Sequence, residues 1–136
     1  AGRRLVRAAA RLPPGGVLLG GGETTVTLGT RPGRGGRNLE LALAAAVALE
    51  GAHGWSLLAA SSDGLDGSAG AAGAFADGRT LSRARRAGRD AESALRRHDT
   101  RPFFAAAGDL FVTGPTGGNV GDWVFLVRNP ARRRPV

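Results

Sequence analysis

The distribution of apolar residues along the chain predicts helices that alternate with short strands. Residues 3–12 carry apolar side chains on one face at helical spacing, whereas residues 39–49 are apolar on nearly every side, which indicates a buried helix. Short runs rich in Leu, Val, Trp or Phe and bounded by Gly or Pro favour strands. We place these strands at residues 17–19, 24–28, 55–60, 110–113 and 123–127.

The segment between the third and fourth predicted strands has a helical character. Residues 80–87 and 91–97 are predicted to form two short helices joined at Gly88, and Asp90 is suited to cap the second one. Pro102 then begins another helical turn, because proline is favoured at the first position of a helix.

Strands that alternate with helices are typical of an α/β layered fold. We expect a three-layer α/β/α domain. Strands adjacent in the sequence occur within 17–28 and within 110–127, which indicates a mixed rather than a purely parallel β-sheet. Glycine-rich loops are expected at the strand ends. The expected division is a connecting helix at 1–14, the α/β domain at 15–128 and a basic tail at 129–136.

The charge of the chain is strongly positive, but its origin weakens the usual interpretation. The 136 residues have a formal net charge of +8, and all 19 lysine and arginine positions are arginine. A uniform preference for Arg, Ala, Gly and Pro is typical of a GC-rich genome, so the charge is a weak indication of nucleic-acid binding. Aromatic residues make up 5% of the chain, and none lies among the arginines of 79–101, which argues against base stacking.

Several classes of protein are excluded by what the sequence lacks. The absence of cysteine excludes a disulfide scaffold, a thiol nucleophile and a cysteine-bound zinc ion. His53 and His98 have no partner at metal-ligand spacing, so we expect them on the surface or as capping residues. No apolar run approaches the roughly 18 residues that span a bilayer, and no signal-peptide pattern opens the chain. We therefore expect a cytoplasmic protein without a membrane segment.

The first candidate site is the glycine-rich loop of residues 29–38. Glycines let backbone N–H groups approach an anion, the following helix start favours negative charge, and Arg34 and Arg37 add forked donors for phosphate or carboxylate. Asn38 resembles a helix cap. The loop is not a Walker A motif, because no Gly-Lys-Ser/Thr ends it. A flexible turn with solvated arginines explains the same residues.

The second candidate is the segment of residues 61–67. Asp63 and Asp66 are three residues apart at a strand end, where carboxylates suit Mg²⁺ or accept a hydroxyl proton. Because Asp-Gly is an ordinary turn dipeptide, the local residues favour a plain turn.

The third candidate is the loop of residues 113–122. Thr116, Asn119 and Asp122 recur there every three residues among glycines, a pattern that suits ligand wrapping or a long hairpin loop. Glu23, beside three glycines, faces either a cleft or water.

Five motifs together are more specific than any one alone. Their order and spacing resemble the MOFRL domain, the C-terminal domain of class II glycerate kinases in the glycerate 2-kinase family, whose members often carry the name hydroxypyruvate reductase. The motifs are Gly-Gly-Glu-Thr-Thr-Val-Thr (21–27), Gly-Arg-Gly-Gly-Arg-Asn-Leu-Glu (33–40), Ser-Asp-Gly-Leu-Asp-Gly (62–67), Ala-Ala-Gly-Ala (71–74) and Thr-Gly-Pro-Thr-Gly-Gly-Asn-Val-Gly-Asp (113–122).

The resemblance implies a function shared between two domains. Enzymes of the family transfer the γ-phosphate of ATP to the 2-hydroxyl of D-glycerate with Mg²⁺, and they combine an N-terminal Rossmann-like domain, which carries a catalytic lysine, with this domain. A chain without lysine would then form one wall of the active site, with glycerate, ATP and the N-terminal domain as partners, and would be inactive alone. The oligomeric state stays open.

The resemblance also assigns roles to individual residues. It implies catalytic roles for Arg37, Arg34 and Asp63, and metal binding by Asp63 and Asp66. The expected cofactor-binding residues are Glu23, Thr24, Gly35, Gly36, Asn38, Thr116, Gly117, Asn119 and Asp122. Because each lies at or near a strand end, we expect them to converge on one edge of the sheet.

Two other functions stay open at this point. One is hydroxypyruvate reduction, although residues 33–38 break the dinucleotide fingerprint at its last glycine. The other is a basic nucleic-acid-binding module, for which a steep salt dependence of DNA retention would be diagnostic.

Overall fold

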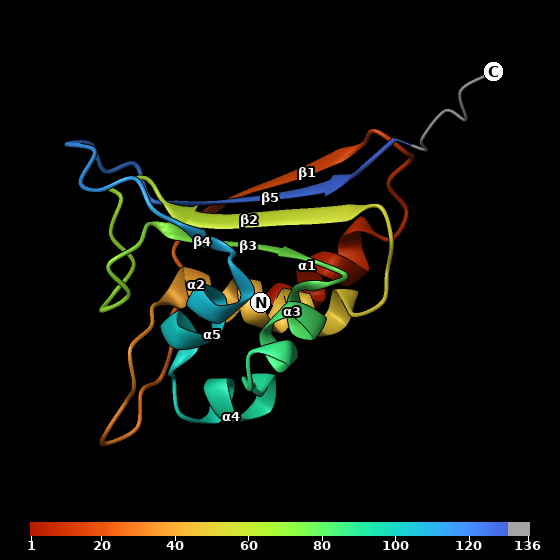
Figure 1. The fold of residues 1–136 in the computed structure, drawn as a ribbon. Helices are drawn as coiled ribbons and strands as arrows, with labels where there is room; N and C mark the ends of the chain where they lie inside the picture. The colour runs from red at the N-terminus through yellow and green to blue at the C-terminus, as the bar shows by residue number, and fades with distance from the viewer. Residues whose placement is uncertain (131–136) are drawn as a thin grey trace.

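The structure is a computed structural model that describes residues 1–130, in which five strands form one sheet (Figure 1). Their order across the sheet is β1-β5-β2-β3-β4, and each neighbouring pair is antiparallel. The strands are β1 (Val17–Gly22), β2 (Trp55–Ser61), β3 (Gly73–Asp77), β4 (Leu110–Phe111) and β5 (Asp122–Arg128).

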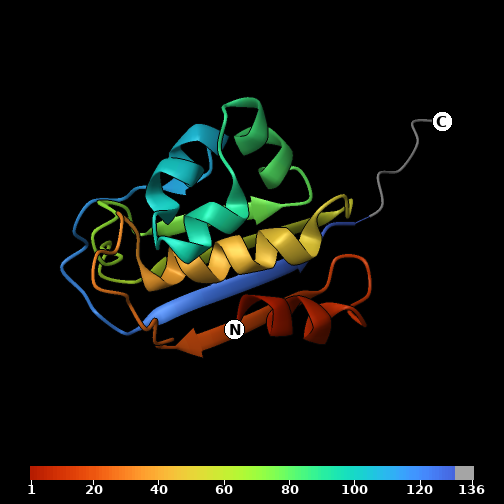
Figure 2. The same cartoon turned by 90° about the horizontal axis from the view of Figure 1, so that it is seen from below.

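The helices gather on one face of this sheet, as the two perpendicular views show (Figures 1 and 2). The domain therefore has two layers within residues 1–130. The helices are α1 (Gly2–Ala9), α2 (Arg37–Leu49), α3 (Thr80–Arg86), α4 (Ala91–Arg96) and α5 (Thr100–Ala107). None of them has the length and apolar character that crossing a membrane requires.

The expected α/β class is confirmed, but two details of the prediction are wrong: the sheet is antiparallel rather than mixed, and it has helices on one face rather than on both. The last strand explains the first difference, because β5 returns to the middle of the sheet and pairs antiparallel with both β1 and β2. An antiparallel sheet needs few crossover helices and tolerates one uncovered face, which explains the second. Leu19, Phe75 and Trp123 are exposed on the sheet.

Two of the expected elements also change. Residues 24–28, predicted as a strand, are irregular, and all of them except Thr27 line a pocket. Strand β3 was not predicted, because its small residues have little intrinsic strand preference. A Cβ at Gly73 would overlap the backbone of Ala59, so this strand depends on close packing rather than on local preference.

The core lies between α2 and the sheet. Helix α2 confirms the prediction of a buried helix, and its alanines allow close approach to β2 and β3. Phe103 and Phe104 of α5 are fully buried beside it. Whether residues 1–14, 15–128 and 129–136 are separate units stays a prediction, and residues 131–136 lie outside the described part.

Strand direction brings the three glycine-rich loops together. The antiparallel pairings make β1, β2 and β4 run in the same direction. The segments that follow them, residues 23–36, 62–72 and 112–121, therefore leave the sheet at the same end, on the left of Figure 1. This end holds the candidate site.

Candidate functional site

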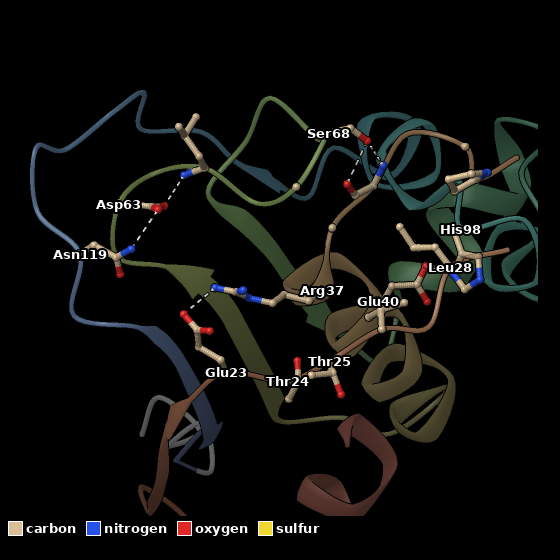
Figure 3. A pocket seen from close by; sticks show the side chains of 17 residues that line it. Glu23, Thr24, Thr25, Leu28, Arg37, Glu40, Asp63, Ser68, His98 and Asn119 are labelled. Atoms are coloured by element: carbon tan, nitrogen blue, oxygen red, sulfur yellow. Dashed lines mark hydrogen bonds and ion pairs between the residues drawn. The ribbon is translucent and has the colours of Figure 1, made fainter. Parts of the chain in front are cut away.

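A pocket of about 700 Å³ lies where these three loops meet the start of α2. Figure 3 shows Asp63 and Asn119 at one end of it, Glu40 and His98 at the other, and Arg37 between them. We predicted that these loops converge on one edge of the sheet. This is confirmed for the loop that leads to Arg37 and for the loop that contains Asp63, because both line the same pocket.

Arg37, the first residue of α2, is held in a fixed orientation. Its Nε and Nη2 donate to the carboxylate of Asp122, with 2.9 Å between Nη2 and Oδ1, and Nη2 also donates to Glu23 Oε1 at 3.2 Å. Asp122 is only 4% exposed, and this hydrogen-bonded ion pair raises the pKa of Arg37 further above its already high value. Within residues 1–130, Nη1 has no partner, so this part of the guanidinium is left for a ligand.

The start of α2 is capped by a carboxylate of the protein itself. Asp66, only 2% exposed, accepts from the backbone N–H groups of Asn38 at 3.1 Å and Leu39 at 2.9 Å, and from the Asn38 amide at 3.3 Å. Burial raises the pKa of Asp66, and these hydrogen bonds oppose that effect. Gly36 rather than Asn38 occupies the cap position, where a Cβ would overlap the Asp66 carboxyl group. The sequence predicted that the start of this helix binds an external anion, but in the structure the Asp66 carboxylate occupies that position.

Asp63 lies on the open side of the same loop. Its Oδ1 accepts from Leu65 N at 2.9 Å and from the Ser61 hydroxyl at 2.8 Å, and these bonds lower the pKa of Asp63. Its other oxygen is 3.5 Å from the amide nitrogen of Asn119. The structure therefore keeps Asp63 ionised in the pocket but does not bring it together with Asp66, the other expected metal ligand. Residues 1–130 contain no cluster of three or more acidic and histidine side chains suited to a metal ion.

Two other predicted positions hold the loops together rather than line the pocket. The Thr116 hydroxyl donates to the Ser62 carbonyl at 2.6 Å, and its backbone N–H donates to the Asp63 carbonyl at 3.0 Å. The side chain of Arg34 is exposed outside the pocket. The backbone of this residue is held by two hydrogen bonds, since its N–H donates to Asp99 Oδ1 and its carbonyl accepts from the Arg101 N–H.

The structure thus sorts the predicted residues by position. Glu23, Thr24, Gly35, Gly36, Arg37, Asp63 and Asn119 line the pocket. Asp122 supports Arg37 from beneath, and Asn38 and Asp66 are buried behind the helix start. Arg34, Thr116 and Gly117 are not among the lining residues.

Two titratable residues of the pocket, Glu40 and His98, were not predicted as site residues. His98 Nδ1 is 3.2 Å from Glu40 Oε1, and both side chains line the pocket. The position of Glu40 three residues after Arg37 on a helix signals a shared face. No sequence signal connects His98 with Glu40, which is 58 residues away.

The chain belongs to the MOFRL family, because the profile of this family matches residues 16–122. Its relatives include glycerate kinases. The chain is 45% identical over 109 residues to D-glycerate 2-kinase of Thermotoga maritima, covering 80% of this chain and 26% of that protein. It is 51% identical over 107 residues to an Agrobacterium vitis protein that carries a hydroxypyruvate reductase name, covering 78% and 24%.

The solved structures agree with this family. The crystal structure of glycerate kinase from Thermotoga maritima superposes with a TM-score of 0.87 at 38% identity, covering 93% of this chain and 32% of that one. The resemblance inferred from the five motifs is therefore confirmed. The chain spans about a quarter of the length of the curated relatives it matches.

Proposed function

We propose that this domain forms one wall of the active site of an ATP-dependent glycerate 2-kinase, which phosphorylates D-glycerate to 2-phosphoglycerate and is inactive when reduced to this domain. The observation that carries the proposal is the arrangement around Arg37, whose guanidinium is oriented by Asp122 and Glu23 and keeps Nη1 for a ligand. A planar guanidinium held in this way suits the oxygens of a transferring phosphoryl group.

The charge of the pocket supports a role as one wall rather than a complete site. Phosphoryl transfer requires neutralisation of several phosphate charges. Here Asp122 already balances Arg37, and Glu23 and Asp63 add negative charge. A metal ion and the rest of the longer protein would supply the additional positive charge that the phosphates require.

The residues present fit Mg²⁺ at one position. Asp63 is exposed to the pocket, and its lowered pKa keeps its carboxylate ionised. Mg²⁺ in phosphotransferases is commonly held by one or two carboxylates together with substrate phosphates. Asp66 does not suit this role, because both of its oxygens are bonded to the start of α2. Bound there, Mg²⁺ would supply charge neutralisation for the phosphates, while Asp63 would hold it and Arg37 would orient the transferring group.

The test is the activity of the intact gene product. We expect it to convert D-glycerate and ATP to ADP and 2-phosphoglycerate in a Mg²⁺-dependent reaction, with the product identified by ³¹P NMR. NADH- or NADPH-dependent reduction of hydroxypyruvate without phosphorylation of D-glycerate would contradict the proposal and favour the reductase alternative.

A further inference from the structure

One residue at the edge of the pocket, His98, has a backbone conformation that is uncommon for residues other than glycine. His98 has φ of +51° and is the single non-glycine residue within 1–130 with positive φ. It follows α4, and its N–H donates to the Leu95 carbonyl at 3.2 Å. Glycine or asparagine is the usual choice where a helix ends in this conformation. Histidine adopts this conformation less readily than glycine or asparagine, and here its side chain lines the pocket.

The surrounding backbone holds His98 in place on both sides. Gly33 N–H donates to the Arg97 carbonyl at 2.8 Å, and Arg34 N–H donates to Asp99 Oδ1 at 2.9 Å. The glycine-rich loop and the segment around His98 are thus bonded together on either side of the imidazole. This arrangement fixes the position of the imidazole at the pocket, where it lies beside Glu40 (Figure 3).

Glu40 orients the imidazole ring. Glu40 Oε1 lies 3.2 Å from Nδ1 of His98, and the other ring nitrogen, Nε2, has no hydrogen-bond partner among residues 1–130. The Glu40 side chain is only 15% exposed. Burial raises the pKa of Glu40, the bond to His98 lowers it, and the nearby Asp66 charge raises it. A protonated imidazole would compensate the buried carboxylate and present an Nε2–H to the pocket.

The charges of the pocket define what this donor would bind. Its charged lining residues are Glu23, Glu40, Asp63 and Arg37, and Arg37 is already paired. Within residues 1–130, His98 is therefore the remaining lining side chain that can become positive. Glu40 follows Arg37 by three residues on α2, so the two lie roughly 5–6 Å apart at their Cβ atoms. In D-glycerate the carboxylate is on the carbon next to the 2-hydroxyl. A substrate whose hydroxyl is near Arg37 therefore has its carboxylate within reach of this end of the pocket.

We propose that His98, oriented by Glu40, binds the carboxylate of a small hydroxy acid as an imidazolium, so that binding of the substrate is coupled to uptake of a proton by this histidine. The proposal rests on the proposed function for the identity of the hydroxy acid. No bond of the substrate changes in this step: one proton moves from solvent to the imidazole, Nδ1–H donates to Glu40, and Nε2–H donates to the carboxylate.

The test is calorimetric titration of the intact gene product with D-glycerate, between pH 6 and 9, in buffers of different ionisation enthalpy. We expect uptake of up to one proton per D-glycerate bound, with a maximum between the pH at which the free protein loses this proton and the pH at which the complex loses it, and an affinity that falls with pH within that interval by up to about tenfold per pH unit. His98→Asn tolerates positive φ and keeps an N–H donor but cannot titrate, so its affinity should not depend on pH and its proton uptake should vanish.

His53→Asn is the matched control. His53 is exposed in the turn before β2, at the opposite end of the sheet, and the variant should retain the wild-type proton uptake. The uncharged methyl ester of D-glycerate should bind without proton uptake, because it lacks the carboxylate. A non-hydrolysable ATP analogue should show the same pH dependence in wild type and His98→Asn, which separates the carboxylate from a phosphate.

Three results would overturn the inference. They are D-glycerate binding without proton uptake, uptake that persists in His98→Asn, and an effect of His98→Asn on the ATP analogue in place of D-glycerate. In each of these cases, D-glycerate kinase activity of the wild type would leave the proposed function standing. Absence of both D-glycerate binding and kinase activity would instead refute the proposed function, and the inference with it.

Discussion

Removal of the Asp66 carboxylate is the sharpest test of how the site is held. This side chain caps α2 from a loop 27 to 28 residues away in sequence and thereby places Arg37 at the pocket. In Asp66→Ala, two backbone N–H groups and the Asn38 amide lose their acceptor in a buried environment. The small alanine side chain offers no replacement.

The magnitude follows from these three hydrogen bonds. Each buried donor left without a partner costs about 1–3 kcal/mol, and loss of a helix cap alone costs about 0.5–2 kcal/mol. Entry of water and removal of a buried charge offset part of this, so we expect the free energy of unfolding to fall by about 3 kcal/mol and Tm to fall by roughly 10 °C. Asp66→Asn should lose less, because burial raises the pKa of Asp66 and the acceptors rather than the charge stabilise the helix start.

The assay is urea unfolding of the 136-residue chain, followed by circular dichroism. Hydrogen exchange at the Asn38 and Leu39 amides provides the local readout and should accelerate in Asp66→Ala. The control is Glu50→Gln, which removes one exposed ion pair with Arg85 and should change stability by less than about 0.5 kcal/mol. The reasoning is refuted if Asp66→Ala stays within about 0.5 kcal/mol of wild type, or if the control loses as much.

Three further predictions concern other residues and the isolated chain. Arg37→Lys in the intact gene product should lower kcat by about 10³-fold while Tm barely changes, because lysine keeps the charge but loses the planar fork; Arg96→Lys, on an exposed helix face, is the control. The 136-residue chain alone should give no turnover of D-glycerate in a coupled ATP assay, and robust saturable turnover would refute the one-wall proposal. Arg83→Met should destabilise the chain by about 2 kcal/mol in urea, because it removes the ion-pair partner of the largely buried Asp109 carboxylate. Burial by itself raises the pKa of Asp77, but hydrogen bonds from a backbone N–H and Arg83 hold it below its ordinary value. The stability that Asp77 contributes is therefore present above its unfolded pKa and is lost as pH falls through the folded pKa, so wild type should lose more stability than Arg83→Met on acidification below about pH 4.

The local sequence was sufficient to predict those helices and strands whose formation depends mainly on residues nearby in the chain. Helix α2 is apolar on nearly every side and β2 is a short apolar run, and both occur close to their predicted positions. Asp90 caps α4 as expected, accepting from Ser93 N–H at 2.7 Å. The five motifs also identified the family, whose profile matches residues 16–122 and so spans all five of them.

The tertiary structure alone decided the sheet order and the members of the site. Local spacing limits which side chains share a face within a few residues, but it does not specify which distant segments meet. Arg34 and Arg37 lie in one loop, yet bonds to Asp99 and Arg101 direct the first outward, while Asp122 holds the second at the pocket. The partnership of His98 with Glu40 has the same origin, since these residues meet only because the chain closes the antiparallel sheet and packs its helices on one face.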